Sequence, residues 1–181
     1  MWLRFMYRDT INSMDLLAKF NQENMSVEEE KQLEQRRSVR GIVLDTDNNI
    51  ALLFTQDKGY YSIPGGGVND DETYEQGIIR ECKEETGCDT EIVKYIGTTL
   101  EYRKNDRQIS EAWGYILKVV GKKGTPVLVG DEDESEKSTV VLWVSVPEAI
   151  RLIESLPAPS KLYLQNCLER DLTFLKAVKI S

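Results

Sequence analysis

Apolar and polar residues alternate along the chain in a pattern that predicts both strands and helices. Runs of β-branched or apolar residues at 39–45 and 50–54 enclose a polar turn, which predicts a β-hairpin. The run at 91–102 contains Gly97, and we expect a break in the strand there. Further strands are predicted at 60–63, 112–120 and 140–145.

Capping residues predict three helices between and after these strands. Thr73 with Gln76 forms a capping-box pattern at the start of the first helix, and Gly87 supplies its C-terminal stop. Ser145 opens a second helix that ends before two prolines, and Ser160 opens a final amphipathic helix. A mixed sheet flanked by helices follows, which places the chain in the α/β class.

The first 37 residues are mostly polar and are interpreted as helical. A short apolar stripe is followed by Ser26 and Glu29, a capping-box pattern that predicts a helix over 27–36. We therefore divide the chain into an N-terminal helical extension at 1–37 and a main domain at 38–181. A separate binding module is the alternative, although 37 residues are few for a core of their own. The stripe consists of Leu16, Leu17 and Phe20.

The predicted helix after Thr73 separates a charged side from an apolar side. Glu81, Glu84 and Glu85 stand at i, i+3 and i+4 and so share one face, where like charges repel. A divalent cation would turn this repulsion into coordination, and carboxylate oxygens favour Mg²⁺ or Mn²⁺ over zinc. The apolar stripe that we expect to face the core consists of Ile78, Ile79 and Cys82.

Composition limits the chemistry that the chain can perform. It has 181 residues, 40% hydrophobic and 30% charged, which suits one soluble domain. No apolar run is long enough to cross a bilayer, and the opening residues lack a signal-peptide pattern, so we expect a cytoplasmic protein. Three cysteines without a CxxC pair indicate reduced thiols. The absence of histidine excludes His-based triads and zinc sites with His ligands.

Net charge constrains the partners. The chain carries −8 from 31 acidic and 23 basic residues, which argues against binding to DNA. Small phosphorylated molecules remain acceptable, because a bound cation reverses the sign of the charge locally.

The segment from Gly66 to Cys88 reads GGVNDDETYEQGIIRECKEETGC. Its Gly66, Glu72, Arg80 and following glutamates resemble the signature GX5EX7REUXEEXGU of the Nudix hydrolase superfamily, which includes MutT-like proteins. Cys82 and Cys88 fill positions that are usually aliphatic, where a buried Cys acts as a small hydrophobe. The resemblance implies a Nudix-type α/β/α sandwich with a mixed sheet, here with N-terminal and C-terminal helical extensions.

The resemblance also implies roles for individual residues. In the family, glutamates matching Glu81, Glu84 and Glu85 bind the cations, and a glycine carbonyl in the preceding loop, here near Gly66, adds a ligand. Arg80 and Glu72 match residues that orient these carboxylates. A distant loop often adds a glutamate as ligand or general base. Here we choose Glu134 from the acidic run at 130–136, ahead of Glu132 and Glu136.

The implied reaction is metal-dependent hydrolysis of the pyrophosphate bond in a nucleoside diphosphate linked to another moiety. Glu81 or Glu134 would accept the proton of the attacking water. A catalytically inactive ligand sensor or partner-binding protein with the same fold is the alternative, and a homodimer is left open. Gly65 and Gly66 would let the backbone approach the substrate, Tyr61 would stack a base and Arg103 would meet a phosphate. Tyr102, Trp113 and Tyr115 are further stacking candidates, each equally compatible with the core.

Overall fold

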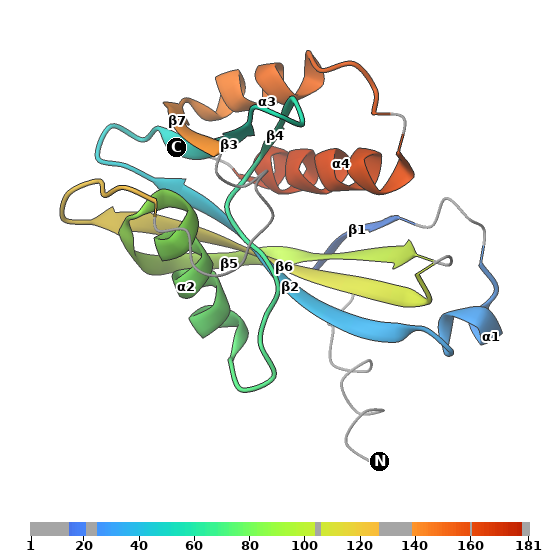
Figure 1. The fold of residues 1–181 in the computed structure, drawn as a ribbon. Coiled ribbons are helices and arrows are strands. Elements are labelled where there is room, and N and C mark those ends of the chain that lie inside the picture. The colour runs from blue at the N-terminus through green and yellow to red at the C-terminus, as the bar shows by residue number, and fades with distance from the viewer. Residues whose placement is uncertain (1–14, 21–24, 104–105, 127–138, 160, 179–181) are drawn as a thin grey trace.

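The chain forms a seven-stranded mixed sheet with helices on both faces (Figure 1). The computed structural model describes residues 15–20, 25–103, 106–126, 139–159 and 161–178. The strand order is β1-β5-β6-β2-β3-β4, and β7 pairs with β3. The strands are β1 (Leu16–Phe20), β2 (Glu34–Leu44), β3 (Ile50–Thr55), β4 (Tyr60–Ser62), β5 (Asp89–Arg103), β6 (Gln108–Val120) and β7 (Thr139–Val144).

Four helices accompany the described part of the sheet: α1 (Val27–Glu30), α2 (Tyr74–Thr86), α3 (Val146–Glu154) and α4 (Leu162–Ala177). Helix α2 lies on one face, and α3 and α4 lie together on the other (Figure 1). Strands β2 and β6 pair in parallel, as do β1 and β5, while β5 and β6 are antiparallel. The predicted α/β/α arrangement around a mixed sheet is confirmed.

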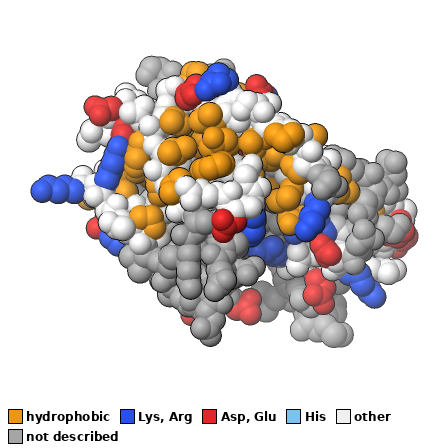
Figure 2. Space-filling model, turned by 45° about the horizontal axis from the view of Figure 1, so that its top comes forward, with side chains coloured by type: hydrophobic (Ala, Val, Ile, Leu, Met, Phe, Trp, Pro, Cys, Tyr) orange, Lys and Arg blue, Asp and Glu red, His pale blue; other side chains and the backbone are white. Residues whose placement is uncertain are grey.

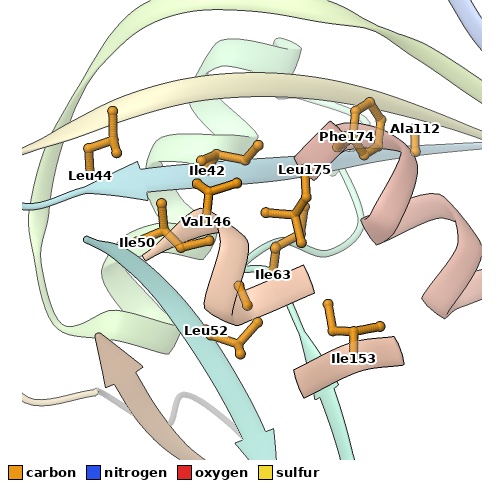
Figure 3. Packing of buried hydrophobic residues seen from close by; sticks show 11 residues of the cluster. Ile42, Leu44, Ile50, Leu52, Ile63, Ala112, Val146, Ile153, Phe174 and Leu175 are labelled. Atoms are coloured by element: carbon orange, nitrogen blue, oxygen red, sulfur yellow. The ribbon is translucent and has the colours of Figure 1, made fainter. Parts of the chain in front are cut away.

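Each face of the sheet has its own apolar core, and β2 contributes to both. Ile42 packs towards α3 and α4, where it meets Phe174 and Leu175 (Figure 3). The next residue, Val43, belongs to the cluster under α2, together with Ile78. This alternation follows from the two-residue period of a strand. Adjacent residues of β2 can therefore serve different sides of the molecule.

The helical interpretation of the N-terminal segment is wrong within the described residues. Leu16–Phe20 forms β1, a strand parallel to β5 in which every second side chain is partly buried. The helix predicted over 27–36 stops at Glu30, although its capping box is present. Strand β2 begins at Glu34 and runs across the predicted boundary between residues 37 and 38. Strand β1 forms because it pairs with β5, and β2 starts early because it pairs with β6; both partners are distant in sequence.

Most other predicted elements are present. The hairpin joins β2 and β3 through Leu44 and Ile50, and β5 continues through Gly97 with irregular pairing around it. The C-terminal extension is helical as predicted, and Lys161 precedes α4 as its N-cap residue. Ser160, predicted as that cap, lies outside the described residues.

Apolar side chains gather in the centre of the face that Figure 2 turns towards the reader, with charged side chains mainly around its margin. Exposed apolar residues of the described chain include Val140 at 38% and Tyr163 at 45%. Within the described residues, the helices are all too short or too polar to cross a membrane. The homodimer left open from the sequence stays a prediction.

Candidate active site

Helix α2 is fixed at both ends by the residues that predicted it. Thr73 and Gln76 form the reciprocal capping box, and Gly87 ends the helix in a left-handed conformation at φ 71°. Ile78 and Cys82 are fully buried against the sheet, as predicted. Ile79 is 42% exposed, so its assignment to the core-facing stripe is wrong.

The glycine loop before α2 is held against β2 by backbone hydrogen bonds. The amide of Val39 donates to the carbonyl of Gly66 at 3.0 Å, and that of Gly41 donates to Pro64 at 2.8 Å. Gly65 adopts φ +141°, a conformation that side chains rarely permit. Its amide faces the opposite way and donates to Oε2 of Glu85 at 2.6 Å. The loop thus connects β2 to the carboxylate face of α2.

Gly66 leaves no room for a side chain beside Glu81. A Cβ atom on this residue would overlap the carboxylate group of Glu81. The backbone can approach the glutamate closely because glycine lacks this atom. The sequence predicted that the backbone here approaches a ligand; in the structure, the carboxylate of Glu81 occupies the space beside Gly66.

Arg80 gathers the predicted carboxylates around one guanidinium group. Its Nε donates to Oε1 of Glu72 at 2.6 Å, and its Nη1 donates to Glu81 at 2.9 Å and to Glu84 at 3.0 Å. Its Nη2 also donates to the carbonyl of Gly67 at 2.9 Å. We call Arg80 with Glu72, Glu81 and Glu84 the carboxylate cluster. Arg80 and Glu72 have the contacts expected of residues that orient the other carboxylates.

The pKa values in this cluster shift in opposite directions. Hydrogen bonds from Arg80 lower the pKa of Glu72 below its ordinary value. Burial raises the pKa of Glu81, although Arg80 opposes that effect. The same ion pairs, with Glu72 first, raise the pKa of Arg80. One guanidinium therefore serves three carboxylates, and the cluster keeps an excess of negative charge.

The donor chemistry of this site fits a hard divalent cation. Within the described ranges, the acidic groups do not converge into a ready-made three-ligand metal site. Instead, Arg80 lies between Glu81 and Glu84, while Gly65 binds Glu85. A cation could neutralise these carboxylates in place of Arg80 and the Gly65 amide, since all the available ligand atoms are oxygens.

The neighbouring carbonyl groups indicate where a backbone ligand would come from. The carbonyls of Pro64 and Gly66 accept hydrogen bonds from β2, and that of Gly67 accepts one from Arg80. In the described part of the chain, the carbonyl of Gly65 accepts no hydrogen bond. It is therefore more available than the carbonyl of Gly66, on which the prediction centred.

A small cavity of about 100 Å³ adjoins Glu85. Lys58, in the turn between β3 and β4, lines it and was missed by the sequence analysis, because nothing local distinguishes it from other surface lysines. Pro126 and Thr139 line the same cavity and flank residues 127–138, which include Glu134. Glu134 itself lies outside the described residues. The other lining residues are Leu53, Thr55, Tyr60 and Ser62.

Two predicted substrate residues lie apart from the carboxylates. Tyr61 packs its ring against Phe54, with centroids 4.6 Å apart, and borders the core under α3 and α4. Arg103 donates two hydrogen bonds of 2.8 Å to the carboxylate of Glu101. It lines a separate cavity of about 230 Å³ next to Tyr163 at the start of α4. Among the described contacts, neither residue meets the carboxylate cluster.

The other aromatic candidates are packing residues. Tyr102 and Tyr115 are buried, at 6% and 2% exposure. Trp113 stacks on Tyr74 with ring centroids 4.2 Å apart. The alternative interpretation of these residues as core therefore holds for the structure described here.

Comparison with known proteins identifies the family. The sequence profile of the NUDIX domain matches residues 34–167. A MutT-like protein from Streptomyces ambofaciens is 32% identical over 66% of this chain and 75% of its own. An ADP-ribose pyrophosphatase from Methanocaldococcus jannaschii is 32% identical over 44% of this chain, and the match spans 48% of that protein.

Solved structures support the same fold. A MutT protein from Methanosarcina mazei matches with a TM-score of 0.52 and 24% identity, over 77% of this chain and 94% of its own. The chain belongs to the NUDIX domain family, as the resemblance of its glutamate-rich helix implied. It is a Nudix hydrolase, and hydrolases of this family generally use divalent metal ions.

Proposed function

We propose that this protein hydrolyses the pyrophosphate bond of a nucleoside diphosphate linked to another moiety, with Mg²⁺ or Mn²⁺ as cofactor. One observation carries the proposal: Arg80 holds Glu81 and Glu84 of α2 together with Glu72 of the preceding loop. Such an excess of carboxylates suits a cation and, through it, a phosphorylated substrate.

The residues of the site divide the work. Glu81, Glu84, Glu85 and the carbonyl of Gly65 or Gly66 would hold the cation, with Arg80 and Glu72 orienting the glutamates. A bound cation would neutralise phosphate oxygens and acidify a water molecule. Lys58 beside Glu85 would provide a positive charge for the phosphates.

The proton of the attacking water has two candidate acceptors. Glu81 is one of them, because it belongs to the carboxylate cluster and burial raises its pKa. Glu134 is favoured by its place in the chain, because the described residues on either side, Pro126 and Thr139, reach the cavity at Glu85. Both remain proposals.

The names of related proteins suggest candidates for the moiety that is linked to the nucleoside diphosphate. One relative is named an ADP-ribose pyrophosphatase and another, from Marinomonas, an RNA pyrophosphohydrolase. Many ADP-ribose hydrolases carry a Pro beyond the glutamate-rich helix where this chain has Arg103. ADP-ribose is therefore one member of the test set rather than the assumed substrate.

The sequence left open a Nudix-fold sensor or partner-binding protein without activity, and the relatives named as pyrophosphatases and diphosphatases argue against it. The full set of glutamates favours the enzyme, since a sensor has no need for Arg80 to hold three carboxylates in place. The cytoplasmic location and the absence of DNA partners remain predictions from the sequence.

The experiment is a substrate screen with and without the ion. ADP-ribose, sugar nucleotides, dinucleoside polyphosphates and nucleoside triphosphates are incubated with Mg²⁺ or Mn²⁺, and nucleoside monophosphate is measured by chromatography. We expect release that requires the ion and disappears in Glu85→Gln. Glu75→Gln, on the same helix but bonded to Tyr115, is the charge-matched control. Tight binding of a nucleotide without hydrolysis would favour the sensor.

A further inference from the structure

A second group of charged side chains lies beneath α4, against the face of β2 opposite α2. Both Nε and Nη2 of Arg170 lie within 2.9 Å of Oδ1 of Asp171, whose Oδ2 accepts from the amide of Ile63 at 3.1 Å. Arg40 of β2 approaches the same Oδ1 with its Nε, at 3.8 Å. We call Arg40, Arg170 and Asp171 the arginine pair with its shared aspartate.

This group has more positive than negative charge. Two guanidinium groups share one carboxylate, and Asp171 already accepts hydrogen bonds at both oxygens. The Nε of Arg40 is buried and has no hydrogen-bond partner among the described residues. Burial and the neighbouring Arg170 lower the pKa of Arg40 to about 10. A buried donor without a partner is costly, which points to an acceptor supplied from outside the described chain.

Arg40 is also next to the proposed cation site. A Cβ atom on Gly65 would lie 2.9 Å from Cα of Arg40, and the amide of Gly65 binds Glu85. The charge of Glu85 acts on Arg40 and raises its pKa, although less than burial lowers it. Arg40 thus lies between the glycine loop and α4, with 14% of its side chain exposed.

We propose that Arg40 binds a phosphate oxygen of the substrate's pyrophosphate group, on the side of the site that faces α4. This inference rests on the proposed function. Once a cation takes up the charge of Glu85, Asp171 is the one carboxylate in ion-pair contact with both Arg40 and Arg170 among the described residues, with Glu101 acting on Arg170 from further away. A pyrophosphate group supplies the missing negative charge and an oxygen acceptor for Arg40, and guanidinium groups bind phosphate well.

A structural role for Arg40 makes different predictions. If Arg40 only anchored α4, its removal would lower the melting temperature without affecting ligand binding. Asp171 keeps Arg170 and the amide of Ile63 after the loss of Arg40, so we expect the Arg40→Gln variant to fold.

The test measures binding rather than turnover. Methylenediphosphonate, a pyrophosphate analogue that cannot be hydrolysed, is titrated calorimetrically in Mg²⁺ into the wild type and three variants. We expect about 10- to 100-fold weaker binding in Arg40→Gln, as for the loss of a hydrogen bond to a charged group. Arg40→Lys should recover part of this loss, because it restores the charge without the planar fork. Arg36→Gln removes an exposed charge from the same strand and should bind like the wild type.

Several results would overturn the inference. These are wild-type affinity in a folded Arg40→Gln, an equal loss in Arg36→Gln, or no binding of the analogue by the wild type. Should Arg40→Gln fail to fold, wild-type affinity in Arg40→Lys would have the same meaning. Binding that depends on Arg40 in a protein that hydrolyses nothing would leave the inference standing and reject the proposed function. Hydrolysis by Arg40→Gln with an unchanged KM would reject the inference about Arg40 and leave the proposed function standing.

Discussion

Two clusters of arginine and carboxylate lie on opposite sides of β2, and their charge ratios are inverted. On the α2 side, Arg80 alone serves Glu72, Glu81 and Glu84. On the α4 side, Arg40 and Arg170 share Asp171. The first cluster is partly open to solvent, with Arg80 29% exposed, while Arg170 is only 7% exposed. Both contain close ion pairs, so contact alone does not distinguish them.

The ratio of charges carries the functional information. A cluster with surplus carboxylates can accept a cation, and one with surplus guanidinium groups can accept an anion. A substrate that bridges the two would carry negative phosphates bound to a cation on one side and to Arg40 on the other. Four changes test this contrast, beginning with the largest expected effect.

Removing one carboxylate from the α2 side should abolish most of the activity. Glu84→Gln and Glu85→Gln each remove a proposed cation ligand, and we expect a loss in kcat/KM of roughly 10²- to 10³-fold. The fold should persist, because both side chains are only partly buried and neither belongs to an apolar core. Full activity in Glu85→Gln, with Glu75→Gln as control, would reject the cation site.

Saturation with Mn²⁺ should stabilise the wild type. A ligand that binds only the folded state adds about 2.7 kcal/mol at a concentration 100 times its Kd. Thermal melting with and without the ion measures this gain, which should shrink in Glu85→Gln and persist in Glu91→Gln, an exposed site on β5. A wild-type melting temperature that ignores saturating Mn²⁺ would contradict a cation site at these residues.

Replacing Arg80 should lower the affinity for the cation, although it removes none of the proposed cation ligands. Arg80→Lys keeps one positive charge but cannot reach Glu72, Glu81 and Glu84 together. We expect roughly 10- to 100-fold lower affinity for Mn²⁺, as for other groups that orient metal ligands. Titration of both proteins with Mn²⁺, followed by electron paramagnetic resonance of the free ion, measures the difference. Equal affinities would show that Arg80 does not position the carboxylates.

The smallest effect concerns Glu72 and depends on pH. Arg80 lowers the pKa of Glu72 in the folded protein, so the ionised carboxylate stabilises the fold above its ordinary pKa, and this contribution disappears as pH falls through the native pKa. Glu72→Gln should therefore cost about 1–3 kcal/mol at pH 7 and progressively less in acid. Urea unfolding across that range provides the measurement. A cost independent of pH would mean that packing, not charge, is lost.

Local signals predicted the helix and its carboxylates, because those features depend on neighbouring residues. The capping box at Thr73, the stop at Gly87 and the spacing of the glutamates all lie within one segment. Strand β1 was misread because its conformation depends on β5, far along the chain. Arg40 was missed for the same reason, since nothing near it in sequence shows that Asp171 and Arg170 lie against it.

The pairing of the glycine loop with β2 makes the length of that segment part of the site. Pro64 and Gly66 direct their carbonyls to β2, whereas Gly65 and Gly67 contact Glu85 and Arg80 on the other side. One residue inserted or removed here would exchange the two sets, as a register slip does in a sheet. The number of residues between β4 and α2 therefore determines which backbone groups face β2 and which face α2, so the length of the loop matters as much as its sequence.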